Sequence, residues 1–260
     1  MIGSWHFHCN SESAIVRGYL VRIGIDQAYG RWNAPANPVT GEFVYLPITD
    51  GPSKQYSPGL KRSYREFLRP FANFSAKYPQ CNPKHVTLPG ELLHSNLHLD
   101  PDFEYLTYGD NGAMRGSGVA SLQRGDIVVF YAGLRSIARQ SRLVYALVGI
   151  LVVDEVVLAN SVEPNRRKEN AHTRWTPISP VDIVVRGQRR LSGRFDRCLP
   201  IGEWRDRAYR VRKDVEEMWG GLSVTDGYIQ RSAVPPSFLS AQQFYTWFRK
   251  QKVVLLERNN

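Results

Sequence analysis

Cysteine is scarce in this chain of 260 residues, which contains only three. They stand far apart, at Cys9, Cys81 and Cys198. An odd number at these positions provides neither a disulfide framework nor the paired spacing of a zinc motif. We therefore expect a reducing, cytoplasmic environment. We assign no residue as a metal ligand, and the cofactor stays unknown.

Long apolar segments are also missing. The longest apolar run covers residues 143–153, about half of the roughly 20 residues that a membrane-spanning helix needs. The first residues, MIGSWH, lack the basic stretch followed by an apolar core that marks a signal peptide. We expect a protein that neither enters a membrane nor is exported. The sequence leaves its oligomeric state open.

Several catalytic signatures are absent as well. No Asp or Glu is followed two positions later by Lys, so the usual carboxylate-x-Lys pair of metal-dependent nucleases is missing. No Gly-x-Ser-x-Gly motif supports acyl transfer, and no paired cysteines support zinc deaminase chemistry. A metal-dependent nuclease is therefore the weakest of the functions considered.

Basic residues, in contrast, are abundant and unevenly placed. The chain has 34 Lys and Arg against 24 Asp and Glu, a net charge of +10. Residues 166–213 contain 14 cations and five anions, so this segment carries +9 of the net charge. Guanidinium groups match phosphate oxygens in two-point geometry, which favours DNA or a nucleotide as the partner. Arg186, Arg189 and Arg190 are the predicted phosphate contacts; the alternative is a solvated basic face, or pairing with the acidic residues at 100–110.

Hydrophobic patterning predicts both strands and helices. The predicted strands cover residues 18–25, 42–48, 127–131, 144–157, 182–186, 194–201 and 253–257. The predicted helices cover residues 64–74, 204–222 and a segment that begins at Ser240. The fold class is therefore α+β, with a mostly antiparallel β-sheet or a small PUA-like β-barrel core and three or more flanking helices. We treat residues 1–15 as a poorly ordered N-terminal lead-in and residues 16–260 as a single domain.

The helix ends are predicted from local signals. Ser63 with Glu66, and Ser240 with Gln243, have the spacing of N-terminal helix caps. The helix at 204–222 is predicted from an apolar stripe at helical spacing: Trp204, Ala208, Val211, Val215, Met218 and Leu222. The glycine pair 220–221 is expected to end it.

An acidic stretch between residues 98 and 110 carries the densest chemistry. In an extended conformation His98, Asp100, Asp102 and Glu104 would project from one face, because strand side chains alternate with a period of two. Like charges on one face repel unless a metal, an arginine or a shared proton compensates them. Three interpretations stay open: a divalent-metal site, a general acid/base group acting on a nucleobase or sugar, and structural pairing with the Arg-rich segment.

The other candidate residues are distributed along the chain. We predict that Asp100, Asp102, Glu104 and His172 are catalytic, with His172 as a second proton handler. The predicted substrate-binding residues combine aromatic faces for stacking with polar and cationic groups: Asp26, Trp32, Asn33, Tyr108, Arg135, Arg174, Tyr228 and Arg231.

Two resemblances follow from these motifs. The Gly-Asp turn at 125–126, the apolar strand ending in Tyr131 and the segment 148–156 resemble the small PUA/ASCH/EVE β-barrels, several of which bind RNA or a flipped base. A wider set of motifs resembles the third nucleotide-modification-associated domain family: Asp26-Gln-Ala-Tyr-Gly30, Trp32-Asn33-Ala-Pro35, Leu99-Asp100-Pro-Asp-Phe-Glu-Tyr-Leu-Thr-Tyr-Gly-Asp110, Phe130-Tyr-Ala-Gly-Leu-Arg135, Asn170-Ala-His-Thr-Arg174, Ile201-Gly-Glu-Trp-Arg205 and Gly227-Tyr-Ile-Gln-Arg-Ser232. This resemblance spans roughly residues 18–260 and implies a role in DNA base modification.

The expected function is that of a DNA- or nucleotide-binding protein in a DNA base modification pathway, which catalyses a step on a nucleobase. Reaching a base in a duplex requires its extrusion, and aromatic side chains then stack on it. The alternative from another class is a non-catalytic reader of modified bases with a PUA-like pocket. A reader needs the basic surface and the aromatic rings, but not the carboxylates.

Overall fold

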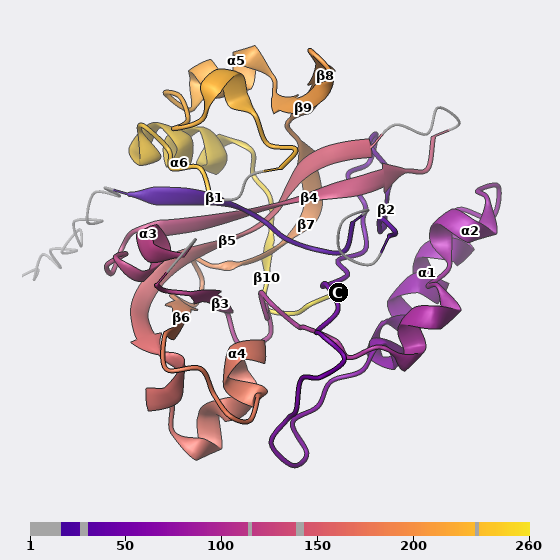
Figure 1. The fold of residues 1–260 in the computed structure, drawn as a ribbon. Coiled ribbons are helices and arrows are strands. Elements are labelled where there is room, and N and C mark those ends of the chain that lie inside the picture. Colours follow the sequence, from indigo (N-terminus) through magenta and orange to yellow (C-terminus); the bar gives the residue numbers. More distant parts are fainter. Residues whose placement is uncertain (1–16, 27–30, 114–115, 139–142, 232–233) are drawn as a thin grey trace, which may run out of the picture.

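The computed structural model describes residues 17–26, 31–113, 116–138, 143–231 and 234–260 (Figure 1). The predicted lead-in at 1–15 lies outside the described residues. The assignment of residues 16–260 to one domain remains a prediction.

A large, mostly antiparallel sheet forms the centre of the fold. Its strands are β1 (Gly18–Arg22), β2 (Pro35–Ala36), β3 (Thr107–Asn111), β4 (Ile127–Ser136), β5 (Leu143–Leu158), β6 (Asp182–Gly187), β7 (Gly193–Pro200) and β10 (Leu255–Leu256). The main path runs β1-β4-β5-β6-β3, while β7 pairs with β5 and β10, and β2 pairs with β4. Only two of these described pairings, those of β1 and β2 with β4, are parallel. A separate hairpin consists of β8 (Gly202–Arg205) and β9 (Ala208–Val211).

Strand β4 shows how the sheet separates two apolar cores. Val128, Phe130 and Ala132 belong to one core, whereas Ile127, Val129 and Tyr131 belong to the other. Because successive strand side chains point to opposite faces, a fully apolar strand is the expected signature of a sheet that is buried on both sides. The unbroken apolar run at 127–134 therefore follows from its central position.

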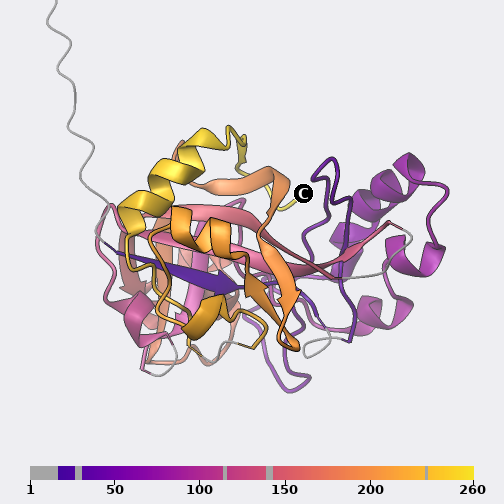
Figure 2. The ribbon, with the colours of Figure 1, turned by 90° about the horizontal axis from the view of Figure 1, so that it is seen from above.

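The helices are short and cover both faces of the sheet. The α-helices are α1 (Leu68–Lys77), α2 (Pro83–Val86), α3 (Ser117–Ala120), α4 (Ala171–Arg174), α5 (Lys213–Met218) and α6 (Ala241–Lys250). The 3₁₀ helices are η1 (Tyr64–Phe67), η2 (Gly90–His94), η3 (Ala159–Ser161), η4 (Pro164–Glu169) and η5 (Thr225–Gly227). In Figure 1, α5, α6 and the β8–β9 hairpin lie on one side of β4 and β5, and α4 lies on the other. Figure 2 shows the same C-terminal elements stacked over the sheet.

Both predicted helix caps are confirmed. Ser63 and Glu66 form a reciprocal capping box at the start of η1. The Ser240 side chain accepts a hydrogen bond from the Gln243 amide at the start of α6. Since these hydrogen bonds join residues two or three positions apart, the local sequence alone was sufficient to predict them.

The helix predicted at 204–222 is wrong over its first half. Residues 202–211 form the β8–β9 hairpin, and helix α5 is confined to residues 213–218. Asp206 and Arg207 form the hairpin turn with positive φ angles of 49° and 61°. Their left-handed backbone cannot continue an α-helix, so the apolar spacing of four and three arises from a strand and a helix placed end to end.

The strand predicted at 42–48 is also wrong. Within the part of the chain that the structure describes, this segment takes part in a single isolated bridge, between Phe43 and Ala36. Its backbone is satisfied in other ways: Tyr45 N donates to Asn260 Oδ1, and Asn260 Nδ2 donates to the Tyr45 carbonyl oxygen. The Asn260 side chain therefore satisfies both backbone groups of Tyr45, while Val44, Leu46 and Ile48 bond to the backbones of Pro35, Ile25 and His98.

The prediction of an α+β fold with a mostly antiparallel sheet and three or more helices is confirmed. The PUA-like barrel remains a prediction. Across the residues described, the helices are all too short or too polar to cross a bilayer.

The hairpin can be tested by a substitution at Arg207 that is expected to raise the free energy of unfolding if residues 202–211 form a hairpin, and to lower it if they form a helix. Arg207→Gly removes an exposed side chain from a left-handed position, so we expect it to stabilise the hairpin by about 0.5–1 kcal/mol. In a helix interior the same change would destabilise by about 1 kcal/mol. The measurement is the urea midpoint of unfolding, with Glu217→Gly in α5 as the helical control. A lower midpoint for Arg207→Gly would contradict the hairpin.

Candidate functional site

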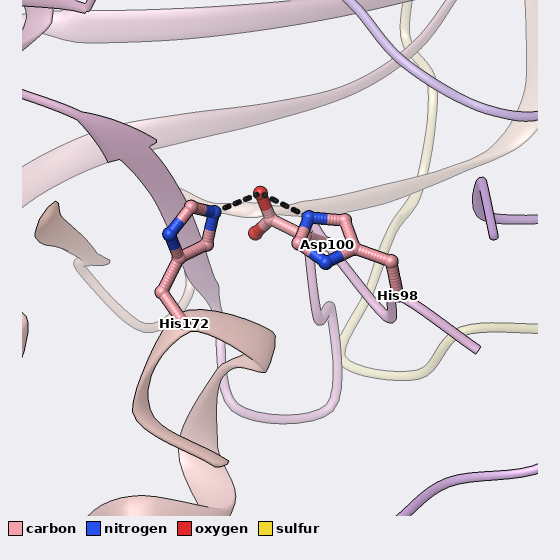
Figure 3. Close-up of side chains that lie close together, drawn as sticks. All are labelled: His98, Asp100 and His172. Carbon is pink, nitrogen blue, oxygen red and sulfur yellow. Dashed lines mark ion pairs between the residues drawn. The ribbon is translucent and has the colours of Figure 1, made fainter. Parts of the chain in front are cut away.

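Two histidines and one aspartate converge on one side of the sheet (Figure 3). His98 and Asp100 lie in the loop that precedes β3, and His172 lies in α4. Asp100 Oδ2 is 3.9 Å from His98 Nε2 and 4.0 Å from His172 Nε2. The three side chains are only 5–11% exposed. This central cluster, defined as His98, Asp100 and His172, is the candidate functional site.

The Asp100 carboxylate is fixed through its other oxygen. Asp100 Oδ1 accepts hydrogen bonds from Gly109 N at 2.8 Å and from Asn170 Nδ2 at 2.7 Å. Asn170 also caps helix α4, because its Oδ1 accepts from His172 N. A side chain at Gly109 would overlap the His172 ring and Asn170 Oδ1. A glycine on β3 is therefore required for α4 to approach the sheet this closely.

Each histidine of the central cluster has a second carboxylate behind it. His172 Nδ1 is hydrogen-bonded to Asp182 Oδ2 at 2.7 Å, and His98 Nδ1 lies 2.9 Å from Asp50 Oδ1. Asp50 Oδ2 accepts from Trp175 Nε1 at 3.0 Å and from the Tyr56 hydroxyl. Both imidazoles are thus held from the Nδ1 side, and both Nε2 atoms face Asp100.

An aromatic ring covers the two imidazoles. The Trp175 ring stacks on His98 with centroids 5.4 Å apart and contacts His172 at 4.6 Å. Lys54 Nζ lies 3.4 Å from the centroid of the Trp175 ring. The central cluster is therefore shielded by an apolar ring and has a cation close by.

The electrostatics of the central cluster reflect its burial. Burial raises the pKa of Asp100, and the charges of His172 and His98 with the hydrogen bonds from Asn170 and Gly109 offset only part of that effect. Burial lowers the pKa of His172, but the hydrogen bond to Asp182 and the charges of Asp100, Asp182 and Asp110 outweigh it, so the net shift is upward. Negative charge on Asp100 is therefore incompletely compensated by the protein.

The other two predicted catalytic carboxylates lie outside the central cluster. Asp102 is fully buried and pairs with the buried Arg174, with its Oδ2 2.5 Å from Arg174 Nη2. Asp102 Oδ1 accepts from Asn259 Nδ2. Glu104 is exposed. The stretch is not extended, because the backbones of Asp102 and Thr107 pair with each other and reverse the chain.

Two of the predicted substrate-binding residues, Tyr108 and Arg174, lie on the elements that carry or contact the central cluster. Tyr108 on β3 is buried, packs on Phe130 and donates to Asp110. Arg174 follows His172 in α4 and points to Asp102.

The remaining six of these residues are not part of the central cluster. Asp26 pairs with Arg22, and Asn33 Nδ2 donates to the Gly133 carbonyl oxygen. Trp32 packs on Phe71, and Arg135 lies in β4 opposite Pro35. Tyr228 contacts the Arg210 guanidinium through its ring, and Arg231 is exposed. Their role in binding remains a prediction.

The predicted phosphate contacts divide into two kinds. Arg186 forms ion pairs with Glu155 and Glu169. These three residues line a polar pocket of about 610 Å³ near the C-terminal end of β6, whereas Asp182 begins this strand. Arg189 is 77% exposed and pairs with Glu257. Arg190 lies in an adjacent groove, lined by Arg190, Leu191, Tyr245, Phe248, Arg249, Lys252, Val253 and Leu255. Among the described residues, no acid lines this groove, which we call the basic groove.

Sequence reasoning found part of the central cluster and missed its outer layer. The His98-x-Asp100 spacing and His172 were singled out, but Asp50 and Asp182 were not. These two acids lie in segments without a recognisable motif, and only the fold brings them to the rings. The segments 98–110 and 166–213 do meet, through the Asp102–Arg174 ion pair and the pairing of β3 with β6.

Comparison with known proteins gives one match. A family model described as nucleotide modification associated domain 3 covers residues 17–227. No curated protein and no solved structure matches the chain.

The role of Asp102 can be separated from that of the central cluster by its effect on stability. Asp102→Asn leaves the Arg174 guanidinium buried without a counter-charge, and removing one partner of a buried pair costs about 3–5 kcal/mol. We therefore expect a large decrease in the urea midpoint of unfolding. Glu104→Gln is the control and should change stability by less than about 0.5 kcal/mol, because Glu104 is exposed. Equal, small effects would show that the ion pair is not a structural element.

Proposed function

The chain belongs to the nucleotide modification associated domain 3 family, which implies a role in nucleotide or DNA modification, and from this premise we propose that it is an enzyme whose reaction on a nucleobase takes place at the central cluster. The observation that carries the proposal is the convergence of His98 Nε2, Asp100 Oδ2 and His172 Nε2 in a buried position. Buried titratable groups with a perturbed pKa and a fixed geometry are typical of reaction sites.

The supports of the central cluster favour catalysis over recognition alone. The Asp100 carboxylate is held by Gly109 and Asn170, and the rings of His98 and His172 are held by Asp50 and Asp182. The three converging atoms are not hydrogen-bonded to one another. Orienting groups of this kind keep reacting atoms within a narrow range of positions. A reader of modified bases gains nothing from a buried carboxylate whose charge is costly to maintain.

The basic groove, which α6 lines on the side of the sheet away from α4 and the central cluster, supplies a surface for the backbone of a nucleic acid. Arg190, Arg249 and Lys252 provide positive charge, and Tyr245 and Phe248 provide aromatic faces in the same depression of about 270 Å³. Cations that follow the backbone and rings that stack on bases are the common features of single-strand binding grooves. We therefore propose DNA, with an accessible or extruded base, as the substrate.

Ion pairs within the protein reduce the number of cations that are available to bind phosphate groups. In the segment 166–213, Arg166, Arg186, Arg205, Arg210 and Arg212 all pair with carboxylates. Much of the local charge excess is therefore used within the protein. Lys252 and Arg190 form no ion pair among the described residues, so their charge is available to phosphate groups.

Binding and reaction can be tested with separate variants. Arg190→Gln combined with Lys252→Gln should weaken binding to a DNA oligonucleotide irrespective of sequence, and should reduce the slope of log affinity against log salt by about 2, one for each phosphate contact. The measurement is fluorescence anisotropy across a salt series. Lys61→Gln combined with Lys84→Gln removes the same charge from exposed positions before α1 and in α2, and should leave the slope unchanged.

The reaction is tested by Asp100→Asn, which keeps an acceptor for Gly109 and Asn170 and removes the charge. We expect unchanged DNA affinity and loss of the modified product. The measurement is mass spectrometry of nucleosides and nucleotides from cells that express either chain. Identical profiles together with unchanged DNA binding would overturn the enzyme and leave a non-catalytic reader.

A further inference from the structure

We propose that the central cluster binds a first-row divalent transition-metal ion through His98 Nε2, Asp100 Oδ2 and His172 Nε2 (Figure 3). These three atoms all lie within 4.8 Å of one another, and they come from two segments that the fold brings together. The part that such an ion would play in a reaction rests on the proposed function. The binding of the ion does not, because it requires no substrate.

The distances around the two rings distinguish a metal site from a shared-proton network. On the Nδ1 side the rings approach carboxylates closely, at 2.7 Å for His172 with Asp182 and 2.9 Å for His98 with Asp50. On the Nε2 side both rings stand 3.9–4.0 Å from Asp100 Oδ2, beyond the roughly 3.2 Å limit of a good hydrogen bond. A shared proton would draw these atoms together, whereas an ion occupies the space between them.

The size of the gap suits an ion. Imidazole nitrogen and carboxylate oxygen bind zinc-like ions at about 2.0–2.2 Å, so two ligands of one ion are separated by at most about 4.2 Å. The separations of 3.9 and 4.0 Å fall within this limit. Two ligands of a tetrahedral site lie about 3.4 Å apart, so the two nitrogen–oxygen distances would shorten by about 0.5 Å, and the two nitrogens, which lie within 4.8 Å of each other, would approach by at most about 1.4 Å.

The second layer has the arrangement that metal-binding histidines need. A metal-ligating imidazole usually donates its other N–H to a carboxylate, which fixes the tautomer with the free lone pair on the metal side. Asp182 Oδ2 is hydrogen-bonded to His172 Nδ1 in this way, and Asp50 Oδ1 lies 2.9 Å from His98 Nδ1. The second Asp100 oxygen is likewise held, by Gly109 N and Asn170 Nδ2. All three ligands are therefore oriented by independent contacts.

Charge also favours a cation here. Asp50, Asp100 and Asp182 bring three carboxylates to the same region, and Lys54 is the cation that contacts the covering Trp175 ring. Buried carboxylates of this density call for a compensating positive charge. Two imidazoles in the ligand set select a transition metal over Mg²⁺ or Ca²⁺, which prefer oxygen ligands alone.

Three protein ligands leave coordination positions open. Sites with two histidines and one carboxylate on one side of the ion retain positions for water or substrate, and act as a Lewis acid there. The Trp175 ring covers the imidazoles from one side, and the converging atoms face away from Asp182 and Asp50. The ion therefore adds an electrophilic centre to the residues described above.

The experiment measures binding of Co²⁺ and Zn²⁺ to the untagged full chain by isothermal titration calorimetry, together with the visible absorption of bound Co²⁺. His6→Gln and His8→Gln are introduced in every protein, so that the N-terminal histidines do not contribute. We expect one ion per chain. His98→Gln, Asp100→Asn and His172→Gln should each weaken binding by at least 100-fold, and Asp50→Asn or Asp182→Asn by about 10- to 100-fold.

His94→Gln provides the matched control, because His94 is exposed at the end of η2 and lies outside the central cluster. It should bind the ion as the parent does. Circular dichroism establishes that each variant is folded, and the Co²⁺ spectrum of the parent tests the ligand type independently of any substitution. No binding by the parent, or equal binding by the parent and all three ligand variants, would overturn the proposal.

The outcomes for the ion and for the proposed function are separable. Stoichiometric binding that depends on the three ligands, without any change in nucleosides in cells, would support the metal site and contradict the enzyme. No ion binding by the parent, together with a change in nucleosides that is lost in Asp100→Asn, would contradict the metal site and leave the proposed enzyme standing.

Discussion

The buried carboxylate of Asp100 is the constraint on which the arrangement of the site depends. One oxygen takes hydrogen bonds from strand β3, through Gly109 N, and from the residue that caps α4, through Asn170 Nδ2. The other oxygen faces the two imidazoles. A buried anion must be compensated by hydrogen bonds or positive charge. The loop before β3, strand β3 and helix α4 each supply such a group, so all three pack around Asp100. The close approach is possible because β3 has a glycine there.

The sheet turns this local constraint into a fixed geometry. Strands β3 and β6 pair with Asn111 opposite Asp182, which places the acid that supports His172 at the end of the same ladder that presents Gly109. Asp102 lies two residues beyond Asp100 and joins Arg174, two residues beyond His172. The central cluster is therefore backed by a second buried contact between the same two segments. Helices α5 and α6 pack on the opposite face of the sheet, and α6 lines the basic groove.

The sequence predicts those features that depend on neighbours along the chain. The caps at Ser63 and Ser240 and the apolar strands β4 and β5 follow from residues within a few positions of one another. The β8–β9 hairpin was missed because Asp206 and Arg207 adopt a left-handed backbone, which their residue types do not predict. His98, Asp100 and His172 were visible as candidates, but their convergence depends on 70 or more residues of intervening chain. Asp50 and Asp182 carry no local signal, since a lone aspartate in a loop or at a strand end is ordinary.

X-ray absorption at the zinc edge, on the zinc-loaded chain carrying His6→Gln and His8→Gln, tests the central claim most directly. The account predicts a first shell of nitrogen and oxygen at about 2.0–2.1 Å, with outer-shell scattering from two imidazole rings and no sulfur. The same spectrum of the chain that also carries Asp100→Asn should lose this ordered shell. A first shell containing sulfur, or scattering from a single imidazole, would contradict the assignment of His98, Asp100 and His172 as the centre of the site.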